Sequence, residues 1–121
     1  MRANATKKAT SLLTAGMTAT ENDGNFGLVA QYSRHLAELS LQSGELDQAL
    51  HFASNALQIT QAHNLWEKGE VYMTTARVNL RMNKINEAEK LVEQAFDYFQ
   101  NKKLTQKAVL AQEFQRQIRN V

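Results

Sequence analysis

The chain repeats itself at a spacing of 39 residues, and this repetition constrains its fold more than any other feature. Residues 43–49 (SGELDQA) align with residues 82–88 (MNKINEA), 39 positions further along. In the same frame, Ala56 aligns with Ala95. A fixed period of this size is typical of helical repeat arrays, in which each unit buries its apolar face only against its neighbours. Because such an array presents an extended surface, the repetition favours a binding function.

The composition favours helices throughout the chain. It has 121 residues with no proline and only five glycines, the two residue types least suited to a helix interior. The absence of cysteine excludes disulfides and thiolate metal sites, and the three histidines form no metal-binding motif. No apolar run has the length of a signal peptide or of the roughly 20 residues that span a bilayer. We therefore expect an all-α, cytoplasmic protein of one domain over residues 1–121, with no cofactor, no metal and no membrane contact.

Charge and motif content narrow the function further. The formal net charge of +2 is too small to favour nucleic acid as a partner. No group of nucleophilic, acidic and basic residues has the spacing of a catalytic site, and no glycine-rich phosphate loop is present. The sequence therefore predicts no catalytic residues, and we do not expect an enzyme.

The repeat frame divides the chain into about six helices. Gly44 is expected to end one helix in the left-handed conformation, and Asn83 occupies the matching position in the next unit. Asn64 and Glu67 have the spacing of a capping box at the start of the second repeat. We expect a half-repeat helix over residues 3–22, a repeat over 25–62, a repeat over 64–100 and a capping helix over 104–120.

The last of these helices has the pattern that the end of an array needs. One side is apolar and the remaining faces carry glutamine, arginine, lysine and glutamate. A helix of this kind can cover the core on one side and face water on the others. The side predicted to be buried consists of Leu104, Ala108, Ala111, Phe114 and Ile118.

Small residues at fixed intervals carry a resemblance to a known family. Ala37, Gly44, Ala49 and Ala56 recur as Ala76, Asn83, Ala88 and Ala95. This pattern resembles the tetratricopeptide repeat (TPR), a helix-turn-helix unit whose paired helices approach closely where alanine or glycine allows it. The resemblance covers about residues 17–118 and implies a right-handed α-solenoid of about six antiparallel helices. The period of 39 is longer than the 34 residues usual in that family, so the second helix or its loop is expected to be longer.

In proteins of this family the first helix of each unit lines a concave groove. The resemblance therefore predicts a partner-binding surface made of residues from the second, fourth and sixth helices. Arginine is prominent in this set, and its planar group suits carboxylates and phosphates. Exposed arginines are also ordinary surface residues, and Arg34 has a potential partner in Glu38 one turn away. The predicted set is Arg34, Glu38, Glu70, Met73, Arg77, Leu80, Arg81, Gln112, Arg116 and Arg119.

Three functions are compatible with the sequence. The first is a scaffold or adaptor that binds a protein or peptide, with acidic groups held by Arg77 or Arg81 and apolar side chains over Met73 and Leu80. The alternative is a sensory or regulatory fragment that acts through dimerisation or through an attached effector domain, with the Ala/Thr-rich first helix forming a homo-oligomer. The third is a phosphotransfer bundle, for which His35 is the one plausible acceptor.

Overall fold

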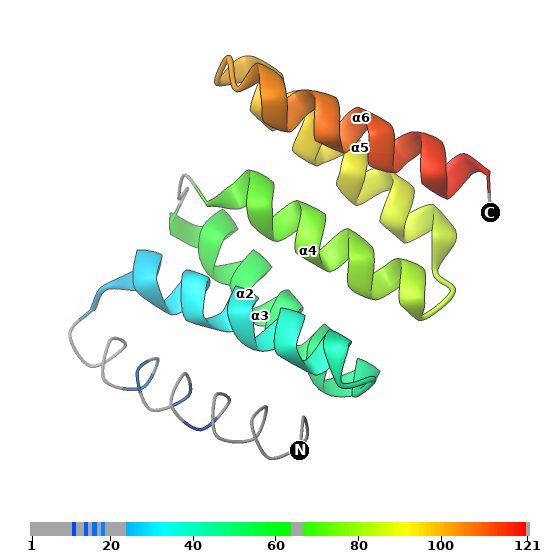
Figure 1. Cartoon of the computed structure of the whole chain (residues 1–121). Helices are drawn as coiled ribbons and strands as arrows, with labels where there is room; N and C mark the ends of the chain where they lie inside the picture. The colour runs from blue at the N-terminus through cyan, green and yellow to red at the C-terminus, as the bar shows by residue number, and fades with distance from the viewer. Residues whose placement is uncertain are drawn as a thin grey trace.

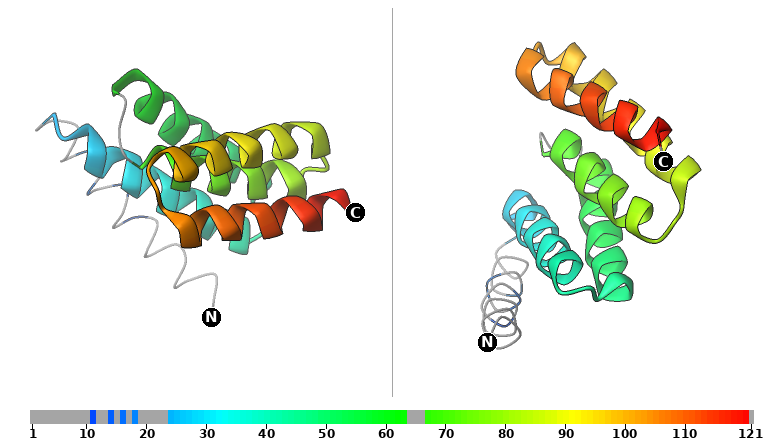
Figure 2. Two further views of the ribbon diagram at one scale, coloured as in Figure 1. Left: turned by 90° about the horizontal axis from the view of Figure 1, so that it is seen from above. Right: turned by 45° about the vertical axis from the view of Figure 1, so that its right-hand side comes forward.

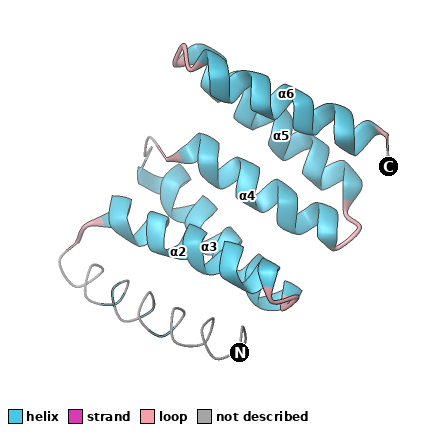
Figure 3. Ribbon diagram, viewed as in Figure 1, coloured by secondary structure: helices cyan, strands magenta, loops and turns pink. Residues whose placement is uncertain are grey.

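The computed structural model describes Ser11, Thr14, Gly16, Thr18, residues 24–63 and residues 67–120. Every regular element in these residues is an α-helix, which confirms the predicted all-α class (Figure 3). The half-repeat helix expected over residues 3–22 lies outside the described residues, apart from those first four. The five continuous helices are α2 (Phe26–Gln42), α3 (Leu46–His63), α4 (Lys68–Arg81), α5 (Ile85–Asn101) and α6 (Thr105–Arg119).

Consecutive helices pack against each other, and α2 also contacts α4. Figure 1 shows α2, α4 and α6 running in the same direction on the near side, with α3 and α5 running oppositely behind them. The turned views of Figure 2 show the same alternation of direction along the chain. We call the surface formed by α2, α4 and α6 the even-helix face. It is the face on which the sequence places the predicted partner-binding residues.

Three of the connections between these helices have the same backbone geometry. Gly44, Asn83 and Lys103 lie in the left-handed region, with φ of 77°, 63° and 60°. In each turn the next residue donates its backbone N–H to the carbonyl five positions back, at 2.8–2.9 Å. This is the Schellman motif, which satisfies carbonyls at a helix C-terminus. The prediction for Gly44 and Asn83 is confirmed, whereas Lys103 lacks the residue type that normally marks this conformation.

The alanines that define the repeat lie in the core. All six of them are fully buried, which allows the helices to approach closely: Ala37, Ala49, Ala56, Ala76, Ala88 and Ala95. Buried residues form two clusters, one between α2, α3 and α4 and the other between α4, α5 and α6. Helix α4 contributes to both, with Val78 in the first cluster and Tyr72 in the second. It therefore links the two halves of the described core.

The structure differs from the expected burial in α6. Ala108, Ala111 and Ile118 are buried as predicted, but Leu104 is 41% exposed. Leu104 precedes the helix at its N-cap position, in the turn after Lys103, and so it does not continue the helical stripe. The outer faces of α6 also carry exposed apolar residues, Val109 and Leu110, where only polar ones were expected.

Candidate functional site

The first two residues of the predicted set bind each other on α2. The Nη1 atom of Arg34 lies 3.2 Å from Oε1 of Glu38, one turn further along the helix. The same carboxylate oxygen accepts a hydrogen bond from the Thr74 hydroxyl of α4 at 3.2 Å. Glu38 therefore connects the two helices, and the charge of Arg34 is balanced within the protein.

The structure brings three predicted residues of α4 together with two residues of α6. Glu70, Met73 and Arg77 line a hollow of about 110 Å³ whose opposite wall is formed by Lys107 and Leu110. The Phe99 ring of α5 closes its base. We call this the α4–α6 hollow. In this hollow apolar and charged side chains surround one space.

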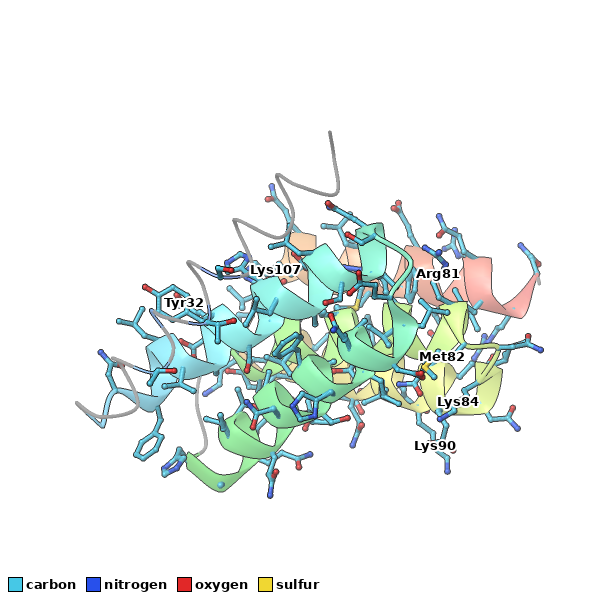
Figure 4. All side chains as sticks on the ribbon, turned by 90° about the horizontal axis from the view of Figure 1, so that it is seen from below. Tyr32, Arg81, Met82, Lys84, Lys90 and Lys107 are labelled. Carbon is cyan, nitrogen blue, oxygen red and sulfur yellow. The ribbon has the colours of Figure 1, made fainter. Side chains whose placement is uncertain are left out.

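The two ends of this hollow differ in charge. Lys107 Nζ lies 2.7 Å from Oε1 of Glu70, so these two charges neutralise each other. Arg77 is half-buried and Arg81 is exposed, and neither forms an ion pair with a carboxylate of the described residues. The hollow thus has a neutralised end at Glu70 and a cationic end at Arg77. In Figure 4 Lys107 and Arg81 lie well apart, and Lys84 and Lys90 lie beyond Met82, farther from Arg81.

Lys107 and Leu110 are absent from the predicted set because the prediction took the same repeat positions on every helix of this face. Helix α6 keeps the 39-residue frame, since its buried residues Ala108, Ala111 and Ile118 lie 39 positions after the buried Gly69, Tyr72 and Asn79 of α4 (108 − 69, 111 − 72, 118 − 79). Side chains that meet between neighbouring helices are offset from this frame. The pairs across the hollow, Glu70 with Lys107 and Met73 with Leu110, are 37 positions apart (107 − 70, 110 − 73), and the contacts between α2 and α4 join residues 36 apart.

Three predicted residues of α6 do not line the α4–α6 hollow. Gln112 lines a separate hollow of about 430 Å³ between α5 and α6, together with Phe96 and Val109. Arg119 lies 3.9 Å from the carboxylate of Glu89 on α5. Arg116 is exposed and makes no ion pair within the described part of the chain. Of the five arginines in the predicted set, Arg34 and Arg119 therefore lie beside carboxylates of this chain, and Arg77 lines the α4–α6 hollow.

The last predicted residue, Leu80, is half-buried and packs against the cluster between α4, α5 and α6. Met73 packs against the same cluster while also lining the hollow. Leu80 therefore contributes to the core, whereas Met73 contributes to both the core and the surface.

A buried carboxylate lies at the start of α4. Glu67 is only 4% exposed, and its Oε1 accepts a hydrogen bond from Gln31 Nε2 at 3.3 Å. Its other oxygen has no hydrogen-bond partner in the described part of the chain. Burial raises the pKa of the Tyr98 hydroxyl above 10.0, and the negative charge of Glu67 raises it further. Glu67 was expected to complete a capping box with Asn64 as the N-cap, but α4 begins at Lys68 and Glu67 itself occupies the N-cap position, with no hydrogen bond from its side chain to the helix start. Asn64 itself lies outside the described residues.

Metal binding, phosphotransfer and membrane insertion each require features that can be checked in the described residues. In the part of the chain that the structure describes, no three histidine, aspartate or glutamate residues gather as they would around a metal ion. His35, the candidate acceptor of the phosphotransfer hypothesis, is exposed on α2. None of the described helices has both the length and the apolar character needed to cross a bilayer.

Comparison with known proteins does not extend this description. No family model, no curated protein and no solved structure matches the chain.

Proposed function

We propose that this chain is a TPR-like helical repeat protein that binds a segment of another protein on its even-helix face. The spacing of the buried alanines and the alternating antiparallel helices support the repeat assignment. One observation carries the binding proposal. Arg77 has no ionic partner among the described residues and lies at the edge of a hollow lined by Met73 and Leu110, and Leu110 is 60% exposed.

These features favour an acidic protein or peptide as the partner. A large apolar side chain exposed beside a concave surface gains free energy when a partner covers it, at about 25 cal/mol per Å² of apolar area. Arginine makes strong bidentate hydrogen bonds to carboxylates. Arg77 and Arg81 lie one helical turn apart, so a segment crossing this surface can bind both. In this proposal the protein acts as a scaffold or adaptor, and its role is recognition.

Affinity capture from the source lysate tests this proposal. The parent protein is compared with Arg77→Glu/Arg81→Glu, and bound proteins are identified by mass spectrometry. The matched control is Lys84→Glu/Lys90→Glu, which makes the same change of net charge at exposed lysines on the α4–α5 turn and on α5. We expect a protein that the parent and the lysine variant retain and that the arginine variant loses. Equal retention by all three proteins would contradict the proposal.

The regulatory alternative rests on another surface. Leu104 and Val109, which are 41% and 46% exposed, line the hollow of about 430 Å³ between α5 and α6. If the protein acts through dimerisation, this apolar surface is a candidate contact. Sedimentation of the parent and of Val109→Glu over a range of concentrations decides the point, because a dimer through this surface would dissociate in the variant.

A further inference from the structure

We propose that the α4–α6 hollow is a subsite for one branched aliphatic side chain next to an acidic residue of the bound segment. This inference rests on the proposed function and specifies the chemistry of the partner at that site. It predicts a motif in which leucine, isoleucine or valine is adjacent to aspartate or glutamate. Three properties of the hollow support it: its volume, its apolar walls and its charge.

The volume favours an aliphatic side chain over an aromatic one. The hollow measures about 110 Å³. An apolar cavity of about 150 Å³ holds a benzene ring, so a space of this size is too small to enclose the ring of phenylalanine or tryptophan. A branched aliphatic side chain is smaller and fits the available space. The size of the hollow therefore favours leucine, isoleucine or valine over phenylalanine or tryptophan at this position of the bound segment.

The walls supply apolar contacts that are incomplete without a partner. The Phe99 ring at the base is 3% exposed and fixed in the core, and Met73 is half-buried against the same cluster. Leu110 contributes the opposite wall and leaves most of its side chain in water. An aliphatic side chain placed between Met73 and Leu110 would remove apolar surface from water on both sides. Methionine can adapt its shape to such a side chain because it is unbranched and has several rotatable bonds.

The charges around the hollow determine which type of residue should lie next to the aliphatic residue in the bound segment. The ion pair between Glu70 and Lys107 leaves neither group available to pair with a partner's charge at that end. Lys107 Nζ also lies 6.0 Å from the centre of the Phe99 ring, a second contact that holds it over the hollow. At the other end Arg77 has no carboxylate partner among the described residues, and Arg81 follows one turn later. An acidic neighbour of the anchor would complete this arrangement, whereas a basic neighbour would be repelled.

Synthetic peptides titrated into the full chain provide the test. The first probe is a five-residue, end-capped peptide in which leucine is flanked by glutamate on both sides. Three further probes replace leucine with glycine, leucine with tryptophan, or both glutamates with glutamine. Methyl-labelled methionine supplies the readout, because Met73 lines the hollow, whereas Met82 packs against the cluster between α2, α3 and α4 and gives a second signal for comparison.

We expect the leucine–glutamate probe to shift the Met73 methyl signal in a saturable way and by more than it shifts the Met82 signal. The glycine and tryptophan probes should bind about tenfold more weakly, because neither places an aliphatic side chain in the hollow. The glutamine probe should bind about two- to fivefold more weakly, because an ion pair near the surface contributes up to about 1 kcal/mol. Tighter binding of the tryptophan probe would overturn the size argument. Equal binding of the glutamine probe would overturn the charge argument.

Variants of the protein locate the site. Leu110→Ser should weaken binding of the leucine–glutamate probe about tenfold, since Leu110 forms one wall. Val109→Ser is the matched control, because Val109 is also exposed on α6 but lines the other hollow. It should bind as the parent does. Arg77→Gln should weaken binding of the glutamate probe and leave the weaker binding of the glutamine probe unchanged.

The outcomes separate this inference from the proposed function. If Leu110→Ser binds the probe as tightly as the parent, or if Met73 does not respond to any probe, the subsite is refuted. The lysate capture with Arg77→Glu/Arg81→Glu then decides independently whether the even-helix face binds a partner. If that capture also fails, the proposed function is refuted together with the subsite.

Discussion

At Glu67 a contact from another helix, rather than the local sequence pattern, determines where the side chain lies. Its spacing from Asn64 predicts a capping box, in which the carboxylate would satisfy backbone N–H groups. In the structure Gln31 of α2 donates to this carboxylate, and the side chain is buried between helices. Sequence alone does not indicate this contact, because Gln31 and Glu67 are 36 positions apart and belong to different helices.

The burial of Glu67 leads to a prediction for Tyr98. Burial and the charge of Glu67 raise the Tyr98 pKa above its ordinary value of 10.0, because both disfavour the tyrosinate. The folded protein therefore holds this proton more tightly than the unfolded chain does. The stabilisation from this proton is fully present below pH 10 and is lost as the pH rises through the raised pKa.

Carbon-13 NMR of the tyrosine Cζ atoms can measure this pKa, since it resolves the three tyrosines of the chain individually. We expect the midpoint for Tyr98 to lie above 10.0 in the parent and to move downward in Glu67→Gln, where the charge is removed but the burial remains. Unfolding by urea above pH 10 should also become less pH-dependent in Tyr98→Phe. A Tyr98 midpoint at or below 10.0 would show that this environment does not disfavour the tyrosinate.

At the scale of whole helices, the period of 39 predicts which side of α6 is buried but not which side chains meet between neighbouring helices. The buried Gly69, Tyr72 and Asn79 of α4 recur 39 positions later as the buried Ala108, Ala111 and Ile118 of α6. The turns after α2 and α4 carry Gly44 and Asn83, which signal a helix end, whereas the turn after α5 carries Lys103, a residue type that rarely adopts positive φ. The pairs that meet across the hollow are 37 positions apart, so the frame selects Gln112 where the structure places Leu110. The residues of α4 in the site were therefore predicted, and those of α6 were not.

The approach of α4 to α5 depends on Gly69. A Cβ atom at this position would overlap the Phe99 ring and would lie 2.8 Å from Cδ1 of Tyr98. Alanine favours a helix over glycine by about 1 kcal/mol, but forcing extra volume into a packed core costs about 1–3 kcal/mol. Since Phe99 is buried and has little room to move, we expect Gly69→Ala to lower the free energy of unfolding by about 1–2 kcal/mol in urea denaturation.

Gly27→Ala is the matched control for this prediction. A Cβ atom on Gly27 would meet its nearest neighbour, Oε1 of Glu67, at 3.4 Å, which is an ordinary contact. This variant should therefore be neutral or more stable by up to about 1 kcal/mol. The double variant Gly69→Ala/Phe99→Leu should lose less free energy of unfolding than the sum of the two single variants, because the smaller leucine makes room for the added methyl group. Additive losses in the double variant would mean that the contact with Phe99 is not the cause.

For the molecule as a whole, the sequence predicts the all-α class and the buried alanines, because both follow from local preferences and a fixed period. It does not predict which charges are neutralised. Glu38 binds Thr74 of another helix, and Lys107 neutralises Glu70 across the hollow. These contacts depend on the distance and rotation between helices, which a single sequence leaves open. Arg77 is identified as an available cation only after the partners of its neighbours are known.

The distribution of contacts predicts that the described helices do not unfold as one unit. Helix α4 contacts α2, α3 and α5 and contributes to both core clusters, whereas the main contact of α6 is with α5. Where stability comes from neighbour-to-neighbour contacts, an end element opens at a lower free energy than a central one. Native-state hydrogen exchange should therefore show lower protection in α6 than in α4.

Ile118→Ala, which removes a buried side chain of α6, should lower protection in α6 and leave α2 and α3 nearly unchanged. Val78→Ala in α4 should lower protection in every helix from α2 to α5. If both substitutions lowered protection equally in all helices, the described core would be a single cooperative unit and the neighbour-to-neighbour interpretation would be wrong.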